Sequence, residues 1–402
     1  MLYTTPLLGV DLEDQLEELD VLRGTLGRQV GEAGIWMGTL RRLVKATSVE
    51  SSTSIEGFHV PTDEAVAIVS GDESPRPDDE DRMAVVCYAR AMEHVGVMAD
   101  DSGFQWSDRV VLDLHFDACS FQRDKSPGRW RVGPIGVTGD GRLIYEAPDA
   151  EQVPTLMAEV VNWLERGDLD THAVVRAAMA HLHVVSIHPF ADGNGRISRI
   201  VQSLVLAREG LLAPEFASIE EYLGEHTPDY YRVLQTIQGG RYQPDRDATP
   251  WISFCIDAHL AQARRRLEQI QQAAARWSFL EQLVRRRVWP ERFVIALEQG
   301  LIGGTDRTRY SEEAAISSAS ATNDSSTVAT TTPQTQFPDA AGQASASSRT
   351  MICLPPIRTT AVQGTVWWAS WSRMPRRSSQ PLCPTQRPVT RSFVAVSSPR
   401  RS

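Results

Sequence analysis

The sequence predicts an all-α protein with one small β-hairpin, and two observations support this class. Apolar residues recur three and four positions apart in successive segments between Leu12 and Trp277, which is the spacing of the buried face of a helix. The strongest hairpin signal is the turn Gly139-Asp140-Gly141, which β-prone residues flank on both sides. The chain has 402 residues, of which 42% are hydrophobic, so it can bury a sizeable core.

The amino-terminal part predicts three helical stretches. Residues 12–49 form a long first region, and residues 83–98 and 106–116 predict two more helices. The polar segment 51–57 is by composition a helix cap or a turn, and the Pro-, Asp- and Glu-rich segment 71–81 predicts an exposed loop. His115 lies on the apolar stripe of its helix, which is typical of a satisfied core histidine.

The central part predicts the hairpin and three further helices. The hairpin covers residues 137–148, and an amphipathic helix follows at 151–166. Residues 173–185 form a nearly all-round apolar run, which is typical of a helix buried in the core. The pattern breaks at Pro189 and restarts after Gly195, so a helix begins on a glycine-rich turn. The apolar positions of this last helix are Ile197, Ile200, Val201 and Leu204, and Gly210 is its stop signal.

The glycine-rich turn lies within residues 188–199, His-Pro-Phe-Ala-Asp-Gly-Asn-Gly-Arg-Ile-Ser-Arg, and its chemistry favours phosphate. The first turn of a helix leaves N–H groups without intrahelical partners and carries a partial positive charge. A Gly193-Asn194-Gly195 turn there can surround an anion with backbone donors. Arg196 and Arg199 are three positions apart, so both can add positive charge to the same pocket.

Two other side chains of this stretch suit phosphoryl chemistry. Asp192 can hold a hard cation such as Mg²⁺, which binds through one or two carboxylates together with substrate phosphates. His188 has an ordinary pKa suited to proton abstraction near neutral pH. Each feature alone is common as a turn or a solvated helix face, whereas their combination within one short stretch is specific.

The stretch resembles the signature of the Fic/Doc family, His-x-Phe-x-Asp/Glu-Gly-Asn-Gly-Arg-x-x-Arg, and agrees with it at every defined position. The resemblance implies a Fic helical core and the transfer of AMP from Mg·ATP to a Ser, Thr or Tyr hydroxyl of a protein target. His188 would deprotonate that hydroxyl, and Asp192 would bind the Mg²⁺ that bridges the α- and β-phosphates. Positioning and electrostatic stabilisation are the main needs of such a transfer.

The resemblance also implies roles for the other residues of the signature. The turn at 193–195 would hold the α- and β-phosphates, and Arg196 would contact the phosphate chain. Arg199 would bind the γ-phosphate, and Phe190 would pack inward to fix the loop.

Two segments outside the signature resemble further features of the family. Ser52, Glu56 and Gly57 match the inhibitory motif Ser/Thr-x-x-x-Glu-Gly/Asn, whose glutamate pairs with the second motif arginine, here Arg199, and blocks the γ-phosphate. Its position ahead of the core implies the class with an amino-terminal inhibitory helix. The hairpin at 137–148 resembles the flap that registers a target segment by main-chain pairing, and an ordinary surface hairpin is the alternative.

Residues 222–240 correspond to the region that closes over the adenine in the family. Tyr230 and Tyr231 would stack on the base, although two aromatic residues in a helix also fit a core position. Gln238 stands where the family commonly has Asn, so that contact departs from the pattern.

Four parts follow one another along the chain. Residues 1–75 are an amino-terminal helical region with the inhibitory motif, and residues 76–276 are the Fic catalytic core. Residues 277–324 resemble a partial, truncated winged helix-turn-helix module. Residues 325–402 are an irregular tail rich in Ser, Thr, Pro and Arg, which predicts either native disorder or a shifted reading frame.

Charge and cysteine usage restrict the function classes. The net charge is −10, but the tail carries nine Arg and a single acidic residue, Asp339, so the rest of the chain is strongly acidic. This disfavours nucleic-acid binding over the whole surface, while a local basic face stays compatible. Five cysteines without paired spacing, and no apolar run approaching about 18 residues, predict a cytoplasmic protein without a membrane span.

We therefore expect an autoinhibited Fic-type protein adenylyltransferase that uses ATP and Mg²⁺. Its expected partner is a hydroxyl-bearing protein, the chain itself included, and a second copy in a homodimer is a further candidate. Two alternatives stay open: removal of AMP or transfer of another phosphate-linked group by the same site, and a DNA-binding regulator with a sensory Fic core. The intact signature and the truncated helix-turn-helix argue against the regulator.

Overall fold

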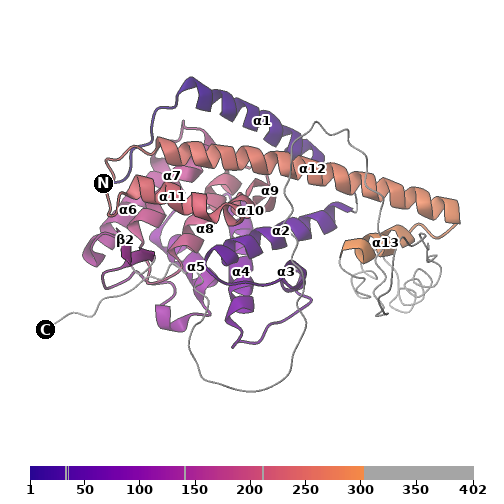
Figure 1. Cartoon of the computed structure of the whole chain (residues 1–402), viewed down its shortest axis with the longest axis horizontal. Coiled ribbons are helices and arrows are strands. Elements are labelled where there is room, and N and C mark those ends of the chain that lie inside the picture. Colours follow the sequence, from indigo (N-terminus) through magenta and orange to yellow (C-terminus); the bar gives the residue numbers. More distant parts are fainter. Residues whose placement is uncertain (32–33, 35, 140–141, 211, 303–402) are drawn as a thin grey trace, which may run out of the picture.

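The computed structural model describes residues 1–31, 34, 36–139, 142–210 and 212–302, and these are largely helical (Figure 1). The all-α prediction with one hairpin is confirmed. In order, the α-helices are α1 (Val10–Gly31), α2 (Trp36–Ile55), α3 (Thr62–Val69), α4 (Glu80–Asp100), α5 (Asp108–Cys119), α6 (Val153–Arg166), α7 (Ala173–Ile187), α8 (Asn194–Arg208), α9 (Pro214–Ala217), α10 (Glu220–Glu225), α11 (Thr227–Gln238), α12 (Thr249–Arg287) and α13 (Phe293–Ile302). The strands are β1 (Gly136–Gly139) and β2 (Arg142–Glu146), and the 3-10 helices are η1 (Arg123–Lys125) and η2 (Ala150–Gln152).

Helices α7 and α8 form the centre of the molecule and pack against each other. Every residue of α7 from Val174 to Ile187 is buried, as the all-round apolar run predicts. Helices α4 and α5 pack against α8, while α6 and α12 pack against α7. Trp251 of α12 is fully buried and donates its indole N–H to the carbonyl of Ala178 at 2.7 Å, so α12 is fixed directly to the central helix.

Local signals explain where several helices begin and end. Asp79 caps α4 by accepting from the N–H of Arg82, and Ser107 caps α5 by accepting from the N–H of Val110. Between the two central helices the chain turns through a pair of left-handed residues. His188 ends α7 with φ 53°, and Gly193 begins α8 with φ 76°. The connection between α7 and α8 is therefore tight, and it contains the first half of the stretch 188–199, whose second half begins α8.

The predicted helical region at 12–49 is divided in the structure between α1 and α2. Helix α2 continues to Ile55, so the polar segment 51–57 is chiefly the last turn of a helix rather than a separate cap. The small hydroxyl residues fit this turn because they bond within it: Ser54 Oγ donates to the carbonyl of Ser51 at 2.9 Å. Gly57 follows with φ 92°, a left-handed conformation that ends the helix.

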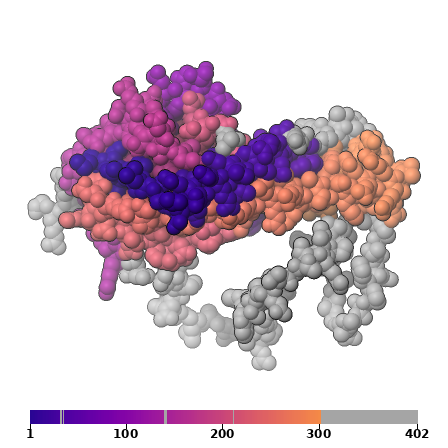
Figure 2. Space-filling view, turned by 90° about the horizontal axis from the view of Figure 1, so that it is seen from above, coloured from indigo at the N-terminus to yellow at the C-terminus, as the bar shows by residue number. Residues whose placement is uncertain are grey.

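Helix α1 lies along α12, and both views show the two helices side by side (Figure 2). Glu18 of α1 pairs with Arg264 of α12, and Gln15 donates to Asp257 at 3.2 Å. Helix α12 runs without a break through residue 276, where the sequence suggested a domain boundary, and α13 packs on its far end. The rest of the predicted winged-helix segment, 303–324, and the tail 325–402 lie outside the described residues.

The hairpin lies over the end of α7. Strands β1 and β2 pair antiparallel, with Val137 opposite Tyr145 and an irregular register before Thr138. The N–H of Glu146 donates to the carbonyl of Gly240 at 2.9 Å, which fixes the hairpin to the segment after α11. Within the described ranges, no helix combines the length and hydropathy that a membrane span needs.

Candidate functional site

His188 stands at the carboxyl end of α7, and its backbone fixes the tautomer of its ring. Its Nδ1 lies 2.7 Å from the carbonyl oxygen of Val185. A carbonyl oxygen only accepts, so Nδ1 is the protonated nitrogen and Nε2 of the neutral ring carries the free lone pair. Burial lowers the pKa of His188 and outweighs the hydrogen bond to Val185, which raises it; the charge of Arg131 lowers the pKa further, against the raising effect of Glu56 and Asp192. The imidazole is therefore neutral near pH 7 and ready to accept a proton at Nε2.

The loop after His188 is held by three interlocking contacts. Phe190 is fully buried and stacks on the ring of His115, with 3.6 Å between ring centroids. The Asn194 side chain makes two hydrogen bonds to the backbone of Phe190. Its Oδ1 accepts from the N–H of Phe190, and its Nδ2 donates to the carbonyl of Phe190, both at 2.9 Å. The Asn194 side chain is thus engaged in holding the loop, so its backbone N–H, in the first turn of α8, is the group that could bind an anion.

His115 is a satisfied core histidine that supports this loop. Its Nε2 lies 3.0 Å from the carbonyl oxygen of Asp192, and its Nδ1 accepts from the N–H of Gly128 at 2.9 Å. Burial lowers the pKa of His115 to about 4, so the ring is neutral and donates through Nε2. The contact fixes the backbone of the residue that precedes the glycine turn.

The start of α8 is shaped by Gly193 and Gly195. At Gly193, a Cβ atom would lie 2.4 Å from Sγ of Cys119, and the residue also has a left-handed φ of 76°, so only glycine fits without strain. At Gly195, a Cβ atom would lie 2.2 Å from Oε1 of Glu56. A carboxylate oxygen thus rests directly on the glycine turn, at the positive end of the α8 dipole.

Arg196 is buried at the same helix end, with 1% of its surface exposed. Its guanidinium lies against the rings of Phe58 and Phe121, at 5.3 and 5.5 Å from their centroids, and the two rings contact each other edge to face. Nη2 donates to Asp192 at 3.0 Å and to Gln122 at 2.9 Å. Nε and Nη1 are buried without a hydrogen-bond partner among the described residues.

Arg199 lies one turn further along α8 and is equally buried. Its Nε donates to Oγ of Ser52 at 2.7 Å, and its Nη2 donates to the carbonyl of Ser52 at 3.0 Å and to Oε1 of Glu56 at 2.9 Å. Burial alone would lower the pKa of Arg199, but the charge of Glu56 raises it above its usual value. Nη1 is buried with no partner in the described part of the chain. The guanidinium of Arg199 therefore joins the first turns of α8 to the carboxyl end of α2 and the residue that follows it.

Comparison with known proteins agrees with this geometry. Residues 105–206 match the Fic/DOC family. This chain contains a Fic/DOC family domain. The domain extends from the segment before α5 to the last turn of α8, so it includes the whole of 188–199.

Relatives of the Fic domain include several named adenylyltransferases. The chain is 28% identical over 159 residues to protein adenylyltransferase fic-1 of Caenorhabditis elegans, a match that covers 39% of this chain and 27% of that protein. It is 37% identical over 79 residues to a probable protein adenylyltransferase of Aquifex aeolicus, covering 20% of this chain and 24% of the relative. The matched region is thus about a quarter of the length of these relatives.

Solved structures share the fold at lower identity. A Fic family protein from Desulfovibrio desulfuricans superposes with a TM-score of 0.57 and 22% identity, over 80% of this chain and 89% of that one. A Fic-domain signalling protein from Bacteroides thetaiotaomicron superposes with a TM-score of 0.52 and 17% identity, over 64% of this chain and 97% of that one. The wide coverage shows that the fold likeness reaches well beyond residues 105–206.

The Fic domain offers one carboxylate for a cation at this site. Asp192 is 32% exposed at its side chain, and one of its oxygens accepts from Arg196. No cluster of three or more His, Cys, Asp or Glu side chains with ligand geometry occurs in the described residues. A single carboxylate with an adjacent phosphate site fits Mg²⁺, which commonly takes its other ligands from the nucleotide and water.

The two tyrosines of α11 are placed differently with respect to the Fic domain. Tyr230 is 1% exposed; its hydroxyl lies 3.0 Å from Nε2 of His181, and its ring packs near Trp251. Tyr231 is only partly buried and donates to the carbonyl of Ile55 at 3.2 Å, beside the end of α2. In this arrangement Tyr231 is the member of the pair that a nucleotide could reach. Gln238 is buried, and its Nε2 donates to Oγ of Ser186 at 3.2 Å.

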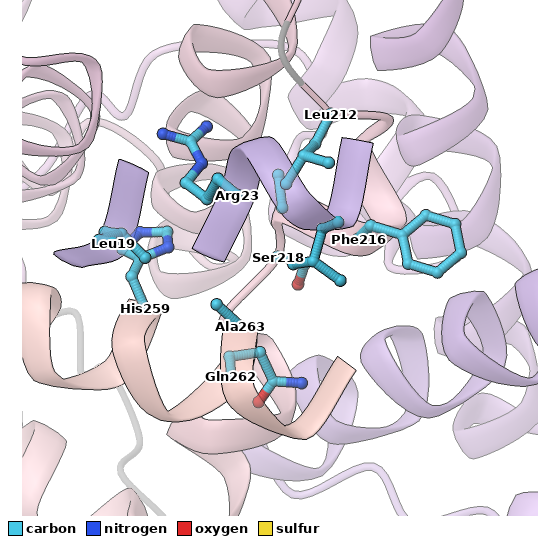
Figure 3. A pocket seen from close by; sticks show the side chains of 10 residues that line it. Leu19, Arg23, Leu212, Phe216, Ser218, His259, Gln262 and Ala263 are labelled. Atoms are coloured by element: carbon cyan, nitrogen blue, oxygen red, sulfur yellow. The ribbon is translucent and has the colours of Figure 1, made fainter. Parts of the chain in front are cut away.

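Small cavities occur near the Fic domain and apart from it. One of about 10 Å³, room for about one water molecule, lies between α1, α9 and α12. Figure 3 shows Arg23 of α1 with His259 and Gln262 of α12 around it. Another cavity of about 10 Å³ adjoins Arg199 between α8 and α10. Neither has the volume of a nucleotide, so the start of α8, where the carboxylate of Glu56 lies against Gly195, is the better candidate for binding one.

The sequence did not reveal the side chains that support the signature from elsewhere in the chain. Phe58 and Phe121 pack against Arg196, and Arg131 donates to the carbonyl of His188 at 2.7 Å. None of these residues belongs to a motif, and a buried arginine is indistinguishable in sequence from a surface one. The only signal for His115 was its place on an apolar stripe.

A Gly193→Ala variant should be destabilised by about 2–4 kcal/mol, because the left-handed backbone and the overpacked Cβ both add to the cost. Gly210→Ala is the matched control: Gly210 has φ 69°, but a Cβ atom added there would meet no heavy atom of the described residues within 4 Å. It should cost only about 1 kcal/mol. Urea unfolding of both variants measures the difference. In a Cys119→Ala background the cost of Gly193→Ala should shrink, and an unchanged cost would refute the clash.

Proposed function

We propose that this chain is a protein adenylyltransferase, which transfers AMP from ATP to a hydroxyl side chain of a protein, and that Glu56 holds it inactive. The observation that carries the proposal is the pair of buried guanidinium groups at the start of α8. Arg196 and Arg199 are each 1% exposed, yet each keeps at least one buried nitrogen without a partner among the described residues. Burying such donors costs free energy of folding unless an anion accepts hydrogen bonds from them.

A triphosphate matches this arrangement of donors. The backbone N–H groups at Gly193-Asn194-Gly195 and the positive end of the helix dipole suit two adjacent phosphate groups. Arg196 would add a fixed charge to the chain of phosphates, and Arg199 would bind the terminal one. Asp192 would hold a Mg²⁺ ion beside them, and this ion would neutralise negative charge on the phosphates.

His188 would act as the base of the reaction. The target hydroxyl oxygen attacks the α-phosphorus of ATP, and the bond from that phosphorus to the pyrophosphate oxygen breaks. The hydroxyl proton passes to Nε2 of His188, whose Nδ1–H stays on the carbonyl of Val185. The products are the AMP-modified side chain and pyrophosphate. Arg131 and burial both favour the neutral ring that this step requires.

Glu56 would compete with the terminal phosphate. Its Oε1 bonds to Arg199 and rests on Gly195, so it occupies the guanidinium and part of the helix end at once. A second anion there would meet like charge at close range and lose its arginine. Ser52 supports the blocked state because its hydroxyl and carbonyl hold the same guanidinium.

The names of the relatives support this function without extending to the whole protein. The C. elegans and A. aeolicus proteins are named as adenylyltransferases, and the matched region is about a quarter of each. The proposed target is therefore a chemical class, a protein with an accessible hydroxyl side chain.

Labelled ATP tests the function directly. The purified full chain and its Glu56→Gly variant are incubated with Mg²⁺, cell lysate and ATP labelled at either the α- or the γ-phosphate. Relative to lysate alone, we expect additional protein-bound label from α-labelled ATP and no additional label from γ-labelled ATP, with more in the variant. Additional label from the γ-phosphate would instead identify phosphate transfer, and no additional label from either, with ATP binding demonstrated, would refute a transferase.

A further inference from the structure

Arg131 precedes the hairpin and is buried with its charge on backbone groups. Its side chain is 6% exposed. Nε donates to the carbonyl of His188 at 2.7 Å, Nη1 donates to the carbonyl of Gly133 at 2.8 Å, and Nη2 donates to the carbonyl of Pro148. The polar partners of this guanidinium in the described structure are thus carbonyl oxygens, which solvate its charge without neutralising it.

The three carbonyls belong to three different parts of the fold. Gly133 lies before β1, Pro148 lies after β2, and His188 ends α7. The backbone N–H of Arg131 also donates to the carbonyl of Pro189 at 2.9 Å, so the main chain and the side chain hold the same loop. One residue therefore joins both ends of the hairpin to the segment that carries His188.

The end of α7 needs such support because its conformation is unfavourable. His188 has φ 53° and ψ 59°, a left-handed conformation that costs a residue with a Cβ about 1–2 kcal/mol. The last carbonyls of a helix lack intrahelical partners and carry partial negative charge. Arg131 supplies a cation there, and Tyr145 of β2 donates its hydroxyl to the carbonyl of Ser186. Arg131 and Tyr145 thus donate hydrogen bonds to carbonyl groups at the carboxyl end of α7.

We propose that Arg131 is the positioning residue of the reaction: it orients His188 through its carbonyl and couples this orientation to the position of the hairpin. This inference rests on the proposed function, in which His188 is the base. Because one guanidinium holds the hairpin and the histidine, a protein segment that docks on the hairpin and fixes its position also fixes the imidazole. The charge of Arg131 additionally favours the neutral ring.

Two substitutions separate the hydrogen bonds from the charge. Arg131→Lys keeps the charge, but its ammonium group lacks the planar guanidinium that donates to three carbonyls at once. Arg131→Gln removes the charge as well. The matched control is Arg176→Gln. Arg176 is 8% exposed and, like Arg131, donates to backbone carbonyls at a helix end, those of Gly167 and Leu164, but it lies away from the signature.

Transfer kinetics form the first measurement, made in the Glu56→Gly background so that activity is measurable. We expect both Arg131 variants to lower kcat by about tenfold to a hundredfold and to raise KM for the protein target, with the Kd of Mg·ATP unchanged. Arg176→Gln should leave kcat and KM within about twofold of the background, even if it lowers the melting temperature as much as the Arg131 substitutions do. Equal losses of kcat in the control would mean that Arg131 is merely structural.

An NMR titration of the histidine side chains forms the second measurement and needs no activity. The His188 signal is assigned by its absence in His188→Ala. We expect the pKa of His188 to rise in Arg131→Gln, because a nearby positive charge is lost, and to stay near the background value in Arg131→Lys and Arg176→Gln. If the pKa is the same in all variants while each stays folded, Arg131 does not act on His188. A shifted pKa in a chain that transfers no AMP would uphold the coupling and reject the proposed reaction.

Discussion

A His188→Ala variant should lose AMP transfer by about a hundredfold to ten-thousandfold, the contribution typical of a positioned general base. The loss follows from the free lone pair on Nε2, which is the acceptor that the structure presents beside the glycine turn. Binding of Mg·ATP should persist, because the proposed phosphate contacts come from α8 and not from the imidazole. Initial rates with α-labelled ATP, together with the Kd of Mg·ATP by calorimetry, separate the two effects.

The control for this experiment is His94→Ala. His94 lies on α4, is partly exposed and pairs with Asp117 at 2.9 Å, away from residues 188–199. Its replacement should change neither the rate nor the nucleotide Kd. Transfer at the background rate by His188→Ala would remove His188 from the role of base, and a lost nucleotide Kd would show that the imidazole serves binding instead.

Replacing Glu56 by Ala or Gly should raise labelling by about tenfold to a hundredfold, the equivalent of one hydrogen bond between charged groups. The variant removes the carboxylate that neutralises Arg199 and lies against Gly195, so the terminal phosphate gains both the charge of the arginine and space. Glu50→Ala is the matched control, because Glu50 lies on α2 ahead of Glu56 and is not among the hydrogen-bond partners of Arg199. It removes one carboxylate from the same segment without changing the partners of Arg199.

The same arginine would serve both the donor and the inhibitor, so the two substitutions cannot be additive. Arg199→Ala should abolish the gain in the Glu56→Ala background, although Glu56 has already been removed there. Labelling of Glu56→Ala no stronger than that of the unaltered chain, with nucleotide binding demonstrated, would reject autoinhibition. Weaker labelling would mean that Glu56 assists the reaction, as expected for a carboxylate that orients water for removal of AMP.

The helical class and the stretch 188–199 could be predicted because their causes are local. Residues 173–185 are apolar on every side, which only a central helix tolerates, and α7 is indeed buried throughout. Gly193 stands where a left-handed turn leaves no room for a Cβ atom. The hairpin followed from its turn residues, and β1 and β2 pair on either side of that turn.

Features that depend on distant contacts were beyond such reasoning. The apolar spacing predicted one helical region over residues 12–49. Where α1 ends and α2 begins depends on how each helix packs against the other helices. The serines at the end of α2 resembled a cap because their hydroxyls usually compete with helix formation. In the structure Ser52 is helical, and its hydroxyl accepts from Arg199, a residue 147 positions away. The partnership of this segment with Arg199 was expected only from the resemblance of Ser52, Glu56 and Gly57 to the inhibitory motif, and not from helix propensity or apolar spacing.

The pairing of α1 with α12 has a consequence for the order in which the protein folds. Glu18 and Arg264 are 246 positions apart, and contacts that close so long a loop cost more entropy and form late. A chain growing from the ribosome would expose residues 188–199, with α7 and α8 able to associate, before α12 exists to receive α1. Helix α1 would be synthesised first and docked last. Helix α2 packs on α3, α4 and α10, which are all made before α12, so a newly made chain could bring Glu56 to Arg199 while α1 is still undocked.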